Sequence, residues 1–459
     1  MHREVIFDTV QVMVVMKFGG SSVADAQRIR HVVRIVKTQL DRQPVLVLSA
    51  MGDTTDHLLE AGNEALQKGV VSIERIEKHH YDTIKKLKLP AQLRRETASL
   101  FEDLQRLLSG ISLIRELTPR TKDFLVSFGE RLSVRIVAAY CNSQGIKARA
   151  CDAWDVGFIS DSRFTSAELL KESWDLIPEK VMPMLESRVL PIVTGFIAKD
   201  SGGNITTLGR GGSDLSATMI AAACKADEAQ VWKDVDGILT ADPRIVGRAR
   251  PVETVSFDEA AELAYFGAQV LHPRAMRPCI RTGTPVLVKN SYNIDAPGTR
   301  IIAALDKKSV PVRAITSRRN VTLVDIVSSR MLGQYGFLAE VFSCFARYQI
   351  SIDMVATSEV SVSLTLDGSQ DISEVKKDLS RIARVGGKTG KAIVTVVGNV
   401  ERSSEILARV FRTCLLIGVS VQMISQGASK VNISFIVDDT EAVDVVKALH
   451  LDFFGTLDN

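Results

Sequence analysis

The sequence lacks several features that would indicate a function directly. Its six cysteines are scattered, with no CxxC pair and no histidines at ligand spacing, so neither a disulfide framework nor a zinc site is expected. Lys and Arg together number 57 against 54 for Asp and Glu, and no basic stripe is interleaved with aromatic residues. Nucleic acid is therefore not an expected partner.

Long apolar runs are missing as well. The run Val10–Met16 is too short to cross a bilayer, and the first residues lack the pattern of a secretory signal. We therefore expect a cytoplasmic protein with no membrane partner and with reduced cysteines. The chain is long, with 459 residues of which 46% are apolar. This is too many for a single hydrophobic core and predicts two or three domains.

The most informative stretch is Thr206–Asp214, Thr-Thr-Leu-Gly-Arg-Gly-Gly-Ser-Asp, which lies between a strand-like run at 189–194 and a helical run at 217–224. Its glycines let backbone N–H groups approach an anion, and a helix start adds partial positive charge. Arg210 can hold a carboxylate or phosphate through two parallel bonds. Ser213 and Asp214 are also good helix N-cap residues, so a plain glycine-rich connection explains this loop equally well.

A second glycine loop follows the first apolar run. Lys17-Phe-Gly-Gly-Ser-Ser-Val23 comes between that run and a helical stretch that extends to Leu40. Lys17 stands at the strand end, where open α/β sheets bind ligands, and Gly19 and Gly20 free the backbone to wrap a phosphate. The order of residues is not that of a Walker A loop, which places its lysine after the glycines. Alone, this loop is more typical of an ordinary connection between strand and helix.

Further strands and helices alternate up to residue 290 and predict an α/β sandwich with a largely parallel sheet. A buried strand at 44–49 and the polar turn after it would bring Ser49 and Thr55 to the crevice beside Lys17, although both residues also suit turns. A helix over 122–140 carries Glu130, whose carboxylate could bind an ammonium group. On sequence alone Glu130, like the histidine pair at 79–80, is more typical of a solvated helix surface.

The stretch from Lys233 to Arg244 clusters aspartates with a glycine after a strand at 229–232. It lacks the alternating ligands and closing glutamate of a calcium loop, so calcium binding is not expected. His272 has no accompanying Ser or Cys nucleophile motif, which favours a structural role. A strand at 286–290 is predicted to close the sheet, and Asp295–Thr299 is predicted to be a turn between domains.

The last third of the chain is an internal repeat. Aligning Phe342 with Phe411 superposes Leu338–Phe342 on Leu407–Phe411 without a gap, and each copy has the pattern of strand, helix, two strands and helix. The copies differ where a ligand would bind. Only the first copy keeps two carboxylates, at Asp353 and Glu359, which an effector with an ammonium group would need.

Five motifs, in this order, resemble those of the aspartokinases, members of the amino-acid kinase superfamily: Lys17–Val23, Ser127–Arg131, Thr207–Asp214, Val231–Gly237 and Phe266–Pro273. The repeats are similar to paired ACT domains, small ligand-binding modules. The resemblance implies an α/β fold with an amino-acid kinase (carbamate kinase-like) αβα sandwich and a mainly parallel sheet over residues 1–300. Ferredoxin-like βαββαβ ACT domains would follow over 311–388 and 389–459, and the resemblance allows them to interleave.

The resemblance implies an aspartate kinase that transfers a phosphoryl group from ATP, with Mg²⁺, to the β-carboxylate of L-aspartate. The product, 4-phospho-L-aspartate, begins the lysine (diaminopimelate), threonine and methionine pathway. A carboxylate is already an anion at pH 7, so no general base is needed, and catalysis depends on alignment and on cations at the phosphates. The residues expected to be catalytic are Lys17, Arg210 and Asp214, and those expected to bind aspartate are Ser49, Thr55, Glu130 and Arg210.

The same resemblance implies a nucleotide site and an effector site. The residues expected to bind ATP are Lys17, Gly19, Gly20, Ser21, Lys233, Asp234, Leu239, Arg244 and Gln269. Of these, Lys233, Leu239 and Gln269 stand where some aspartokinases have Thr, Tyr and a phosphate-binding Lys. The residues expected to bind L-lysine, as an allosteric inhibitor, are Met331, Gly336, Phe337, Leu338, Ser351, Ile352, Asp353, Thr357, Ser358 and Glu359.

Pairing of ACT domains between chains predicts a homodimer or homotetramer. Two alternatives to this function remain at the level of sequence. One is a sister kinase that acts on another small acid, and the other is a non-catalytic amino-acid sensor with an inactive kinase body. The paired repeats argue against the first alternative, and the intact Lys17, Arg210 and Asp214 argue against the second.

Overall fold

The computed structural model describes residues 12–265, 271–305, 311–328, 335–427 and 429–455. The chain divides into two compact units, which are described separately. One unit consists of Met1–Ile238 and Val270–Ala304, and the other consists of Leu239–Gln269 and Leu305–Asn459.

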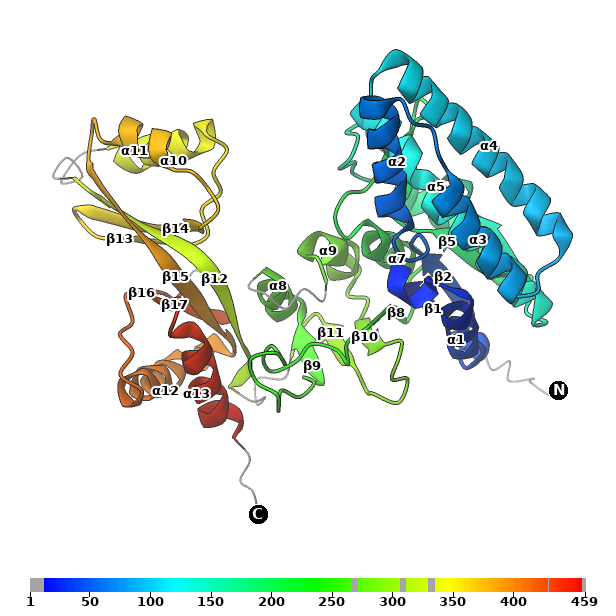
Figure 1. Cartoon of the computed structure of the whole chain (residues 1–459). Helices are drawn as coiled ribbons and strands as arrows, with labels where there is room; N and C mark the ends of the chain where they lie inside the picture. Colours follow the sequence, from blue (N-terminus) through cyan, green and yellow to red (C-terminus); the bar gives the residue numbers. More distant parts are fainter. Residues whose placement is uncertain (1–11, 266–270, 306–310, 329–334, 428, 456–459) are drawn as a thin grey trace, which may run out of the picture. The chain divides into compact units, whose positions relative to one another are not determined.

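The first unit is built on a mainly parallel sheet (Figure 1), whose strands follow the order β3-β5-β2-β1-β8-β10-β11. Every neighbouring pair in this series is parallel except β10 with β11. Strands β1, β2 and β5 are buried along their whole length, as expected of a parallel sheet packed between helices. The bounds are β1 Val14–Phe18, β2 Pro44–Leu48, β3 Ala148–Cys151, β5 Leu190–Thr194, β8 Glu228–Lys233, β10 Val286–Asn290 and β11 Thr299–Ile302.

The helices of this unit are α1 Ala26–Lys37, α2 Thr54–Lys68, α3 Glu74–Lys86, α4 Ala91–Ile114, α5 Pro119–Ser143, α6 Ser173–Glu186, α7 Gly212–Ala223 and α9 Pro273–Thr282. Helices α2 to α5 pack on one another through a core that includes Leu58, Leu104 and Phe128. His80 of α3 is fully buried beside this core, and its Nδ1 contacts the Ile76 carbonyl at 2.7 Å. The prediction of a solvated His79–His80 surface is therefore wrong for His80, because α3 turns that side chain towards Phe101 of α4.

Two connections differ from the sequence prediction. The run that ends at Thr194 does not enter the glycine loop directly, because a hairpin of β6 (Ile197–Asp200) and β7 (Ile205–Thr207) intervenes. Asp200 accepts a hydrogen bond from Asn204 N at 2.8 Å and closes the hairpin turn. Strand β10 does not close the sheet either, since β11 pairs with it in antiparallel fashion. The segment 295–299 is accordingly a hairpin connection inside the first unit.

The second unit contains an antiparallel sheet in the order β13-β14-β12-β15-β17-β16. Helices α10 and α11 lie at one end of the long strands and α12 and α13 at the other (Figure 1). The bounds are β12 Val312–Val327, α10 Phe337–Arg347, β13 Val355–Thr357, β14 Ser361–Asp367, α11 Ser373–Leu379, β15 Arg384–Gly398, α12 Ser403–Leu416, β16 Met423–Ser425, β17 Asn432–Asp438 and α13 Ala442–Phe454.

Strands β12 and β15 belong to both repeats. The end of β12, from Val321, pairs with β14 and with the start of β15, which completes a four-stranded ferredoxin-like half. The start of β12 pairs with the end of β15, which in turn pairs with β17, and these strands form the second half with β16. The first half is therefore inserted into the second, and position 388 lies inside β15.

Residues 239–265 pack with the second unit although they come from the middle of the kinase sequence. Ala241 is buried in the core of the second half with Ile315 and Val394. Ile315 N donates to the Thr240 carbonyl at 2.8 Å, and the Thr240 hydroxyl contacts His450 at 2.9 Å. The stretch continues through β9 (Thr254–Ser256) into α8 (Phe257–Tyr265), where Arg313 pairs with Glu259 at 3.8 Å.

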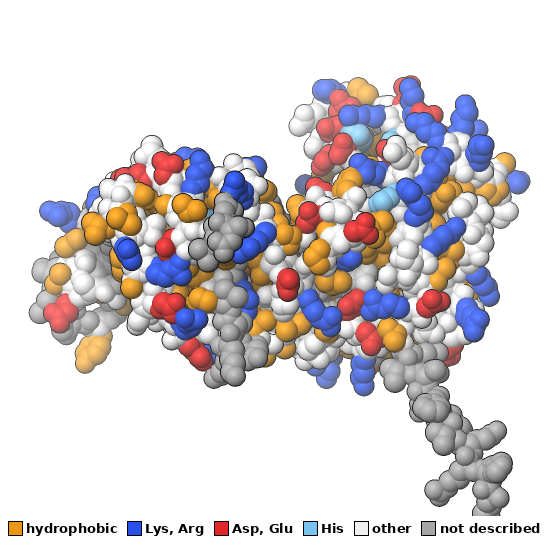
Figure 2. Space-filling model, turned by 90° about the horizontal axis from the view of Figure 1, so that it is seen from below, with side chains coloured by type: hydrophobic (Ala, Val, Ile, Leu, Met, Phe, Trp, Pro, Cys, Tyr) orange, Lys and Arg blue, Asp and Glu red, His pale blue; other side chains and the backbone are white. Residues whose placement is uncertain are grey.

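The surface carries charges of both signs. On the face drawn in Figure 2, Lys and Arg side chains lie among Asp and Glu side chains. This agrees with the near balance of charge in the sequence. Within the described residues, each helix is too short or too polar to span a bilayer.

Candidate active site and effector site

The carboxyl ends of β1 and β8 bring two lysines to one buried carboxylate. Lys17 in β1 pairs in register with Val231, and Lys233 lies two residues further along β8, so both side chains leave the same face of the sheet. Lys17 Nζ lies 2.7 Å from Asp214 Oδ1, and Lys233 Nζ lies 3.6 Å from Asp214 Oδ2. Lys17 is only 7% exposed and Asp214 only 5%, so the cluster is shielded from bulk water.

This cluster has a net positive charge. Burial alone would raise the pKa of Asp214, but Lys17 and Lys233 outweigh it and hold that pKa below its ordinary value. Burial lowers the pKa of Lys233, while the attraction of Asp214 opposes this shift. Two ammonium groups that share one carboxylate leave charge available for an anion, which suits a phosphoryl group.

The loop after β1 lies against the loop after β2 because Gly20 has no side chain. A Cβ on Gly20 would stand 2.9 Å from the Ala50 carbonyl oxygen, closer than real Cβ atoms approach, and 3.0 Å from that of Gly52. Gly52 N donates to the Gly20 carbonyl at 3.0 Å. The residues Gly20–Val23 form a short 3-10 helix, which places Ser21 on the surface of the loop.

Helix α7 begins differently from the prediction. Its N-cap is Gly211, with φ of 73°, and neither Ser213 nor Asp214 caps it. Two features require glycine at position 211. The left-handed φ disfavours other residues, and a Cβ there would lie 2.8 Å from the Cβ of His272. Because Asp214 does not cap the helix, its carboxylate is available to pair with Lys17 and Lys233. Ser213 accepts a hydrogen bond from the Ser49 hydroxyl at 3.0 Å, which brings Ser49 to the start of α7.

Glu130 is not the surface residue that α5 alone suggests. It is 3% exposed, because this part of α5 packs on α2 and on the loop after β2. Its Oε1 accepts a hydrogen bond from Ala50 N at 3.2 Å, whereas Oε2 has no hydrogen-bond partner among the described residues. Burial raises the pKa of Glu130 to about 8. A buried carboxyl with a vacant oxygen is suited to receive an ammonium group.

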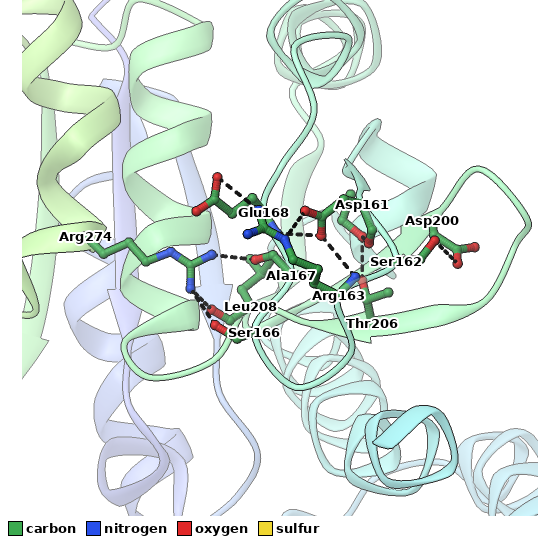
Figure 3. A network of polar contacts seen from close by, with 11 residues as sticks. Asp161, Ser162, Arg163, Ser166, Ala167, Glu168, Asp200, Thr206, Leu208 and Arg274 are labelled. Atoms are coloured by element: carbon green, nitrogen blue, oxygen red, sulfur yellow. Dashed lines mark hydrogen bonds and ion pairs between the residues drawn. The ribbon is translucent and has the colours of Figure 1, made fainter. Parts of the chain in front are cut away.

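Arg210 is exposed in the glycine loop. Arg274 of α9 holds this loop in place (Figure 3). The Arg274 guanidinium donates to the Leu208 carbonyl at 2.8 Å and to the Ala167 carbonyl at 2.5 Å. Thr207, before the loop, donates its N–H at 2.9 Å and its hydroxyl at 2.8 Å to buried Asp123. His272 has the structural role that was predicted, since its Nδ1 accepts from Arg274 N as the cap of α9.

The sequence analysis missed Asp123 and Arg274. Neither lies in a recognisable motif: Asp123 is one polar residue in a long helical run, and Arg274 follows His272-Pro273 without a distinctive pattern. Both act on segments distant in sequence, which no local pattern reports.

The other predicted residues fall into three groups. Thr55 lies half-buried on α2, and Asp234 is exposed just past β8, so both belong to the first unit with Lys17. Leu239 and Arg244 belong to the second unit, where exposed Arg244 pairs with Asp242 at 2.6 Å. Gln269 lies outside the described residues. The structure therefore describes Leu239 and Arg244 in a different unit from the lysine pair.

In the second unit, the start of α10 and the segment before β13 carry the predicted effector residues. Asp353 Oδ1 accepts from Arg318 at 2.9 Å and from the Tyr265 hydroxyl at 2.6 Å, and its side chain is 3% exposed. Asp353 Oδ2 is buried without a hydrogen-bond partner among the described residues. Arg318 also reaches Asp367 Oδ2 at 3.0 Å.

The other effector candidates are arranged around two turns. Gly336 caps α10 with φ of 91°, followed by buried Phe337 and exposed Leu338. Ser358 contacts Ser361 at 2.7 Å in the exposed turn after β13. The remaining positions are Ser351, Ile352, Thr357 and Glu359, of which all but Ile352 are exposed, and Met331, which lies outside the described residues.

Comparison with known proteins agrees with this architecture. The model of the amino acid kinase family matches residues 12–290, and an ACT domain model matches residues 324–378 and 394–453. The fold and the lysine pair at the strand ends thus define a kinase body of the amino acid kinase family with ACT domains attached. More closely, the chain is 50% identical to aspartokinase 1, chloroplastic, of Arabidopsis thaliana over 97% of its own length and 80% of that protein. The chain belongs to the aspartokinase family.

Two solved structures of aspartokinase III from E. coli are similar over almost the whole chain. One is a complex with aspartate and ADP, called the R-state, with a TM-score of 0.79 and 34% identity over 96% of this chain and all of that one. The other is a complex with lysine and aspartate, called the T-state, with a TM-score of 0.80 and 34% identity over 96% of this chain and 99% of that one.

Proposed function

We propose that this aspartate kinase transfers the γ-phosphoryl group of ATP to the β-carboxylate of L-aspartate and that L-lysine inhibits it. The observation that carries the catalytic part is the net positive cluster of Lys17, Lys233 and Asp214 at the ends of β1 and β8. Donor and acceptor in this reaction are both anions, so preorganised cations where they meet lower the barrier.

Each catalytic residue is assigned a separate task. Lys17 and Lys233 would contact the transferring phosphoryl group, with the amides of Gly19 and Gly20 beside them. Asp214 would hold the two ammonium groups apart and in place, which makes it a positioning residue. The position of Lys233, 3.6 Å from Asp214 and beside Lys17, supports a phosphate-binding role for it.

The aspartate substrate would bind between α5 and the glycine loop. Glu130 Oε2, which has no partner among the described residues, would accept the α-ammonium group. Arg210 is exposed at the loop tip, and its fork would hold the α-carboxylate, while Ser49 and Thr55 add hydroxyl donors. The E. coli complex with aspartate and ADP supports an aspartate site in this fold.

The nucleotide would enter with Mg²⁺. The described residues contain no group of three or more side chains that could hold a metal ion, so the nucleotide phosphates must supply most of the ligands. This fits the habit of Mg²⁺ of keeping several waters and using one or two carboxylates. Exposed Asp234, just past β8, is the carboxylate we propose for this role, and Ser21, Leu239, Arg244 and Gln269 complete the proposed ATP site.

The effector site is proposed at Asp353 in the first ACT half, with the predicted residues of the α10 start and of the turn after β13 around it. We propose residues 1–300 as the catalytic sequence, including the stretch packed on the second unit, and 311–388 and 389–459 as interleaved ACT sequences. Exposed apolar side chains on α10 and α12, including Phe342 and Leu415, support a homodimer or homotetramer through these domains.

Two further proposals concern cellular context. The product would feed the synthesis of lysine, threonine and methionine. All six cysteines are free, and five of them are buried, which supports a reducing compartment such as the cytoplasm.

The experiment that tests this function is a coupled assay of ADP release with the full chain. L-aspartate should support turnover, whereas L-glutamate, N-acetyl-L-glutamate and carbamate should not, and millimolar L-lysine should inhibit the reaction. Activity on another acid in place of aspartate would indicate a sister kinase. Lysine binding without any turnover would indicate a sensor.

A further inference from the structure

One buried residue, Ser291, ties the end of strand β8 to the loop after β1. Ser291 directly follows β10 and is 2% exposed, and it belongs to the same unit as β1 and β8. Its backbone N donates to the Lys233 carbonyl at 2.7 Å, and its hydroxyl donates to the same carbonyl at 2.9 Å. The Ser291 Oγ also lies 3.1 Å from the Ser22 Oγ. Ser291 therefore contacts both sides of the proposed phosphate site.

The direction of these hydrogen bonds follows from the groups that make them. A carbonyl oxygen only accepts, so the Ser291 hydroxyl gives its single proton to Lys233. Ser22 must then donate to Ser291. The Ser291 carbonyl accepts in turn from His31 Nε2 of α1 at 2.5 Å, which holds the backbone of Ser291 in place. The result is a directed chain from the Ser22 hydroxyl, through the Ser291 hydroxyl, to the backbone of Lys233.

Both ends of this chain of hydrogen bonds belong to the proposed phosphate site. Ser22 is 2% exposed, and its backbone N donates at 3.0 Å to the carbonyl of Gly19, whose amide is proposed to face the phosphoryl group. Lys233 is the last residue of β8, and its side chain extends to Asp214. The two hydroxyls are shielded from water, which strengthens the bonds between them. They therefore fix the spacing between the loop after β1 and the strand end that carries Lys233.

We infer that Ser291 is a positioning residue for phosphoryl transfer, which holds Lys233 and the loop after β1 at the spacing that the reaction needs. A phosphoryl group bound from two sides is stabilised only while both sides keep their places, and a displacement of about 1 Å can cost about a hundredfold in rate. Ser291 acts through Lys233 and through Ser22. This inference rests on the proposed function and adds a residue outside the motifs on which that function was predicted.

The test measures steady-state kinetics of the full chain with L-aspartate and Mg·ATP. Ser291→Ala removes the hydroxyl but keeps the backbone bond to Lys233, and it should lower kcat about 3- to 10-fold, as expected for one hydrogen bond. The KM for aspartate should stay within about twofold of the wild-type value, because the proposed aspartate ligands do not contact Ser291. Ser22→Ala should lower kcat to a similar extent. The double variant should lose no more than the larger single loss, since the two hydroxyls act in one chain.

Ser173→Ala is the matched control.

Ser173, at the start of α6, is fully buried in the same unit, and its hydroxyl donates to the Ile159 carbonyl at 2.9 Å and accepts from Ile159 N at 3.0 Å. Its loss should lower the melting temperature, as that of Ser291 does, but keep the wild-type kcat. A wild-type kcat in Ser291→Ala, an equal loss of kcat in Ser173→Ala, or losses that multiply in the double variant of Ser22 and Ser291 would overturn the inference alone. A wild-type chain without aspartate-dependent turnover would overturn the proposed function together with it.

Discussion

Two buried carboxylates, Asp214 in the first unit and Asp353 in the second, lie in clusters of opposite net charge. Asp214 is shared by the ammonium groups of Lys17 and Lys233, so its cluster is positive. Asp353 shares the single guanidinium of Arg318 with Asp367, so its cluster is negative. Each cluster therefore favours a ligand of the opposite sign, a phosphate at the first and an ammonium group at the second.

The second ACT half supplies a neutral counterpart to the Asp353 cluster. At the position of Asp353 it has Gln422, which is exposed, and the nearby cation Lys391 pairs with Asp438. This ion pair of one cation and one carboxylate has no net charge of its own, unlike the group of Arg318 with two carboxylates. The two halves have similar strands but different charges at these equivalent positions, which is why we propose the effector site in the first half alone.

The largest expected effect concerns the positive cluster. Lys17→Ala should lower kcat about a hundredfold, roughly 3 kcal/mol in the barrier, because a cation at the γ-phosphate gains strength as charge redistributes in the transition state. The KM for aspartate should change far less. Steady-state kinetics with varied aspartate and ATP measure both, and a kcat within twofold of the wild-type value would remove Lys17 from the phosphoryl site.

The next effect concerns the negative cluster. Asp353→Ala should abolish inhibition by L-lysine, which for a typical coupling changes apparent activity about 5- to 150-fold, because the ammonium group loses its carboxylate. Gln422→Ala is the control in the neutral half and should leave inhibition nearly unaltered. Activity titrations with lysine on both variants compare the halves directly. Full inhibition that survives in Asp353→Ala would mean that the comparison of charges has misplaced the effector.

The smallest expected effect concerns Glu130, another buried carboxyl, which has no ion pair among the described residues. Its pKa is raised to about 8, so below that pH the free enzyme holds a proton that an incoming ammonium group must displace. Between pH 7 and pH 8 the kcat/KM for aspartate should therefore rise by at most about tenfold, and it should level off above pH 8. In Glu130→Gln this rise should disappear, and a rise that persists would assign it to another group.

Local pattern predicted most of the elements but few of the contacts between them. Around Lys17 and Arg210 the sequence predicts a strand, a glycine turn and a helix from periodicity and turn residues, which act over a few positions. The structure has a strand before each glycine loop and a helix after it. Residue type alone allowed Ser213 or Asp214 to cap α7, since both are good N-cap residues. In the structure Gly211 is the N-cap, and the close approach of His272, from a distant segment, requires glycine there.

The same distinction applies to the sites. Lys17 and Asp214 could be named from their motifs, but their ion pair depends on the register between β1 and β8. Asp123, Arg274 and Tyr265 act on residues far along the chain and carry no motif, so only the folded chain reveals them. Glu130 was expected on the surface because helical periodicity does not say which neighbours will cover a face.

The exchange of strands between the two ACT halves sets a limit on how these modules can be separated or recombined. Since β12 and β15 each serve both halves, cutting the chain at any single position cannot release one half with all four of its strands. A chimera that replaces the second half must carry residues from before the first half as well as after it. Because the two halves share β12 and β15, neither half can be exchanged as one contiguous segment of the chain that leaves these strands whole.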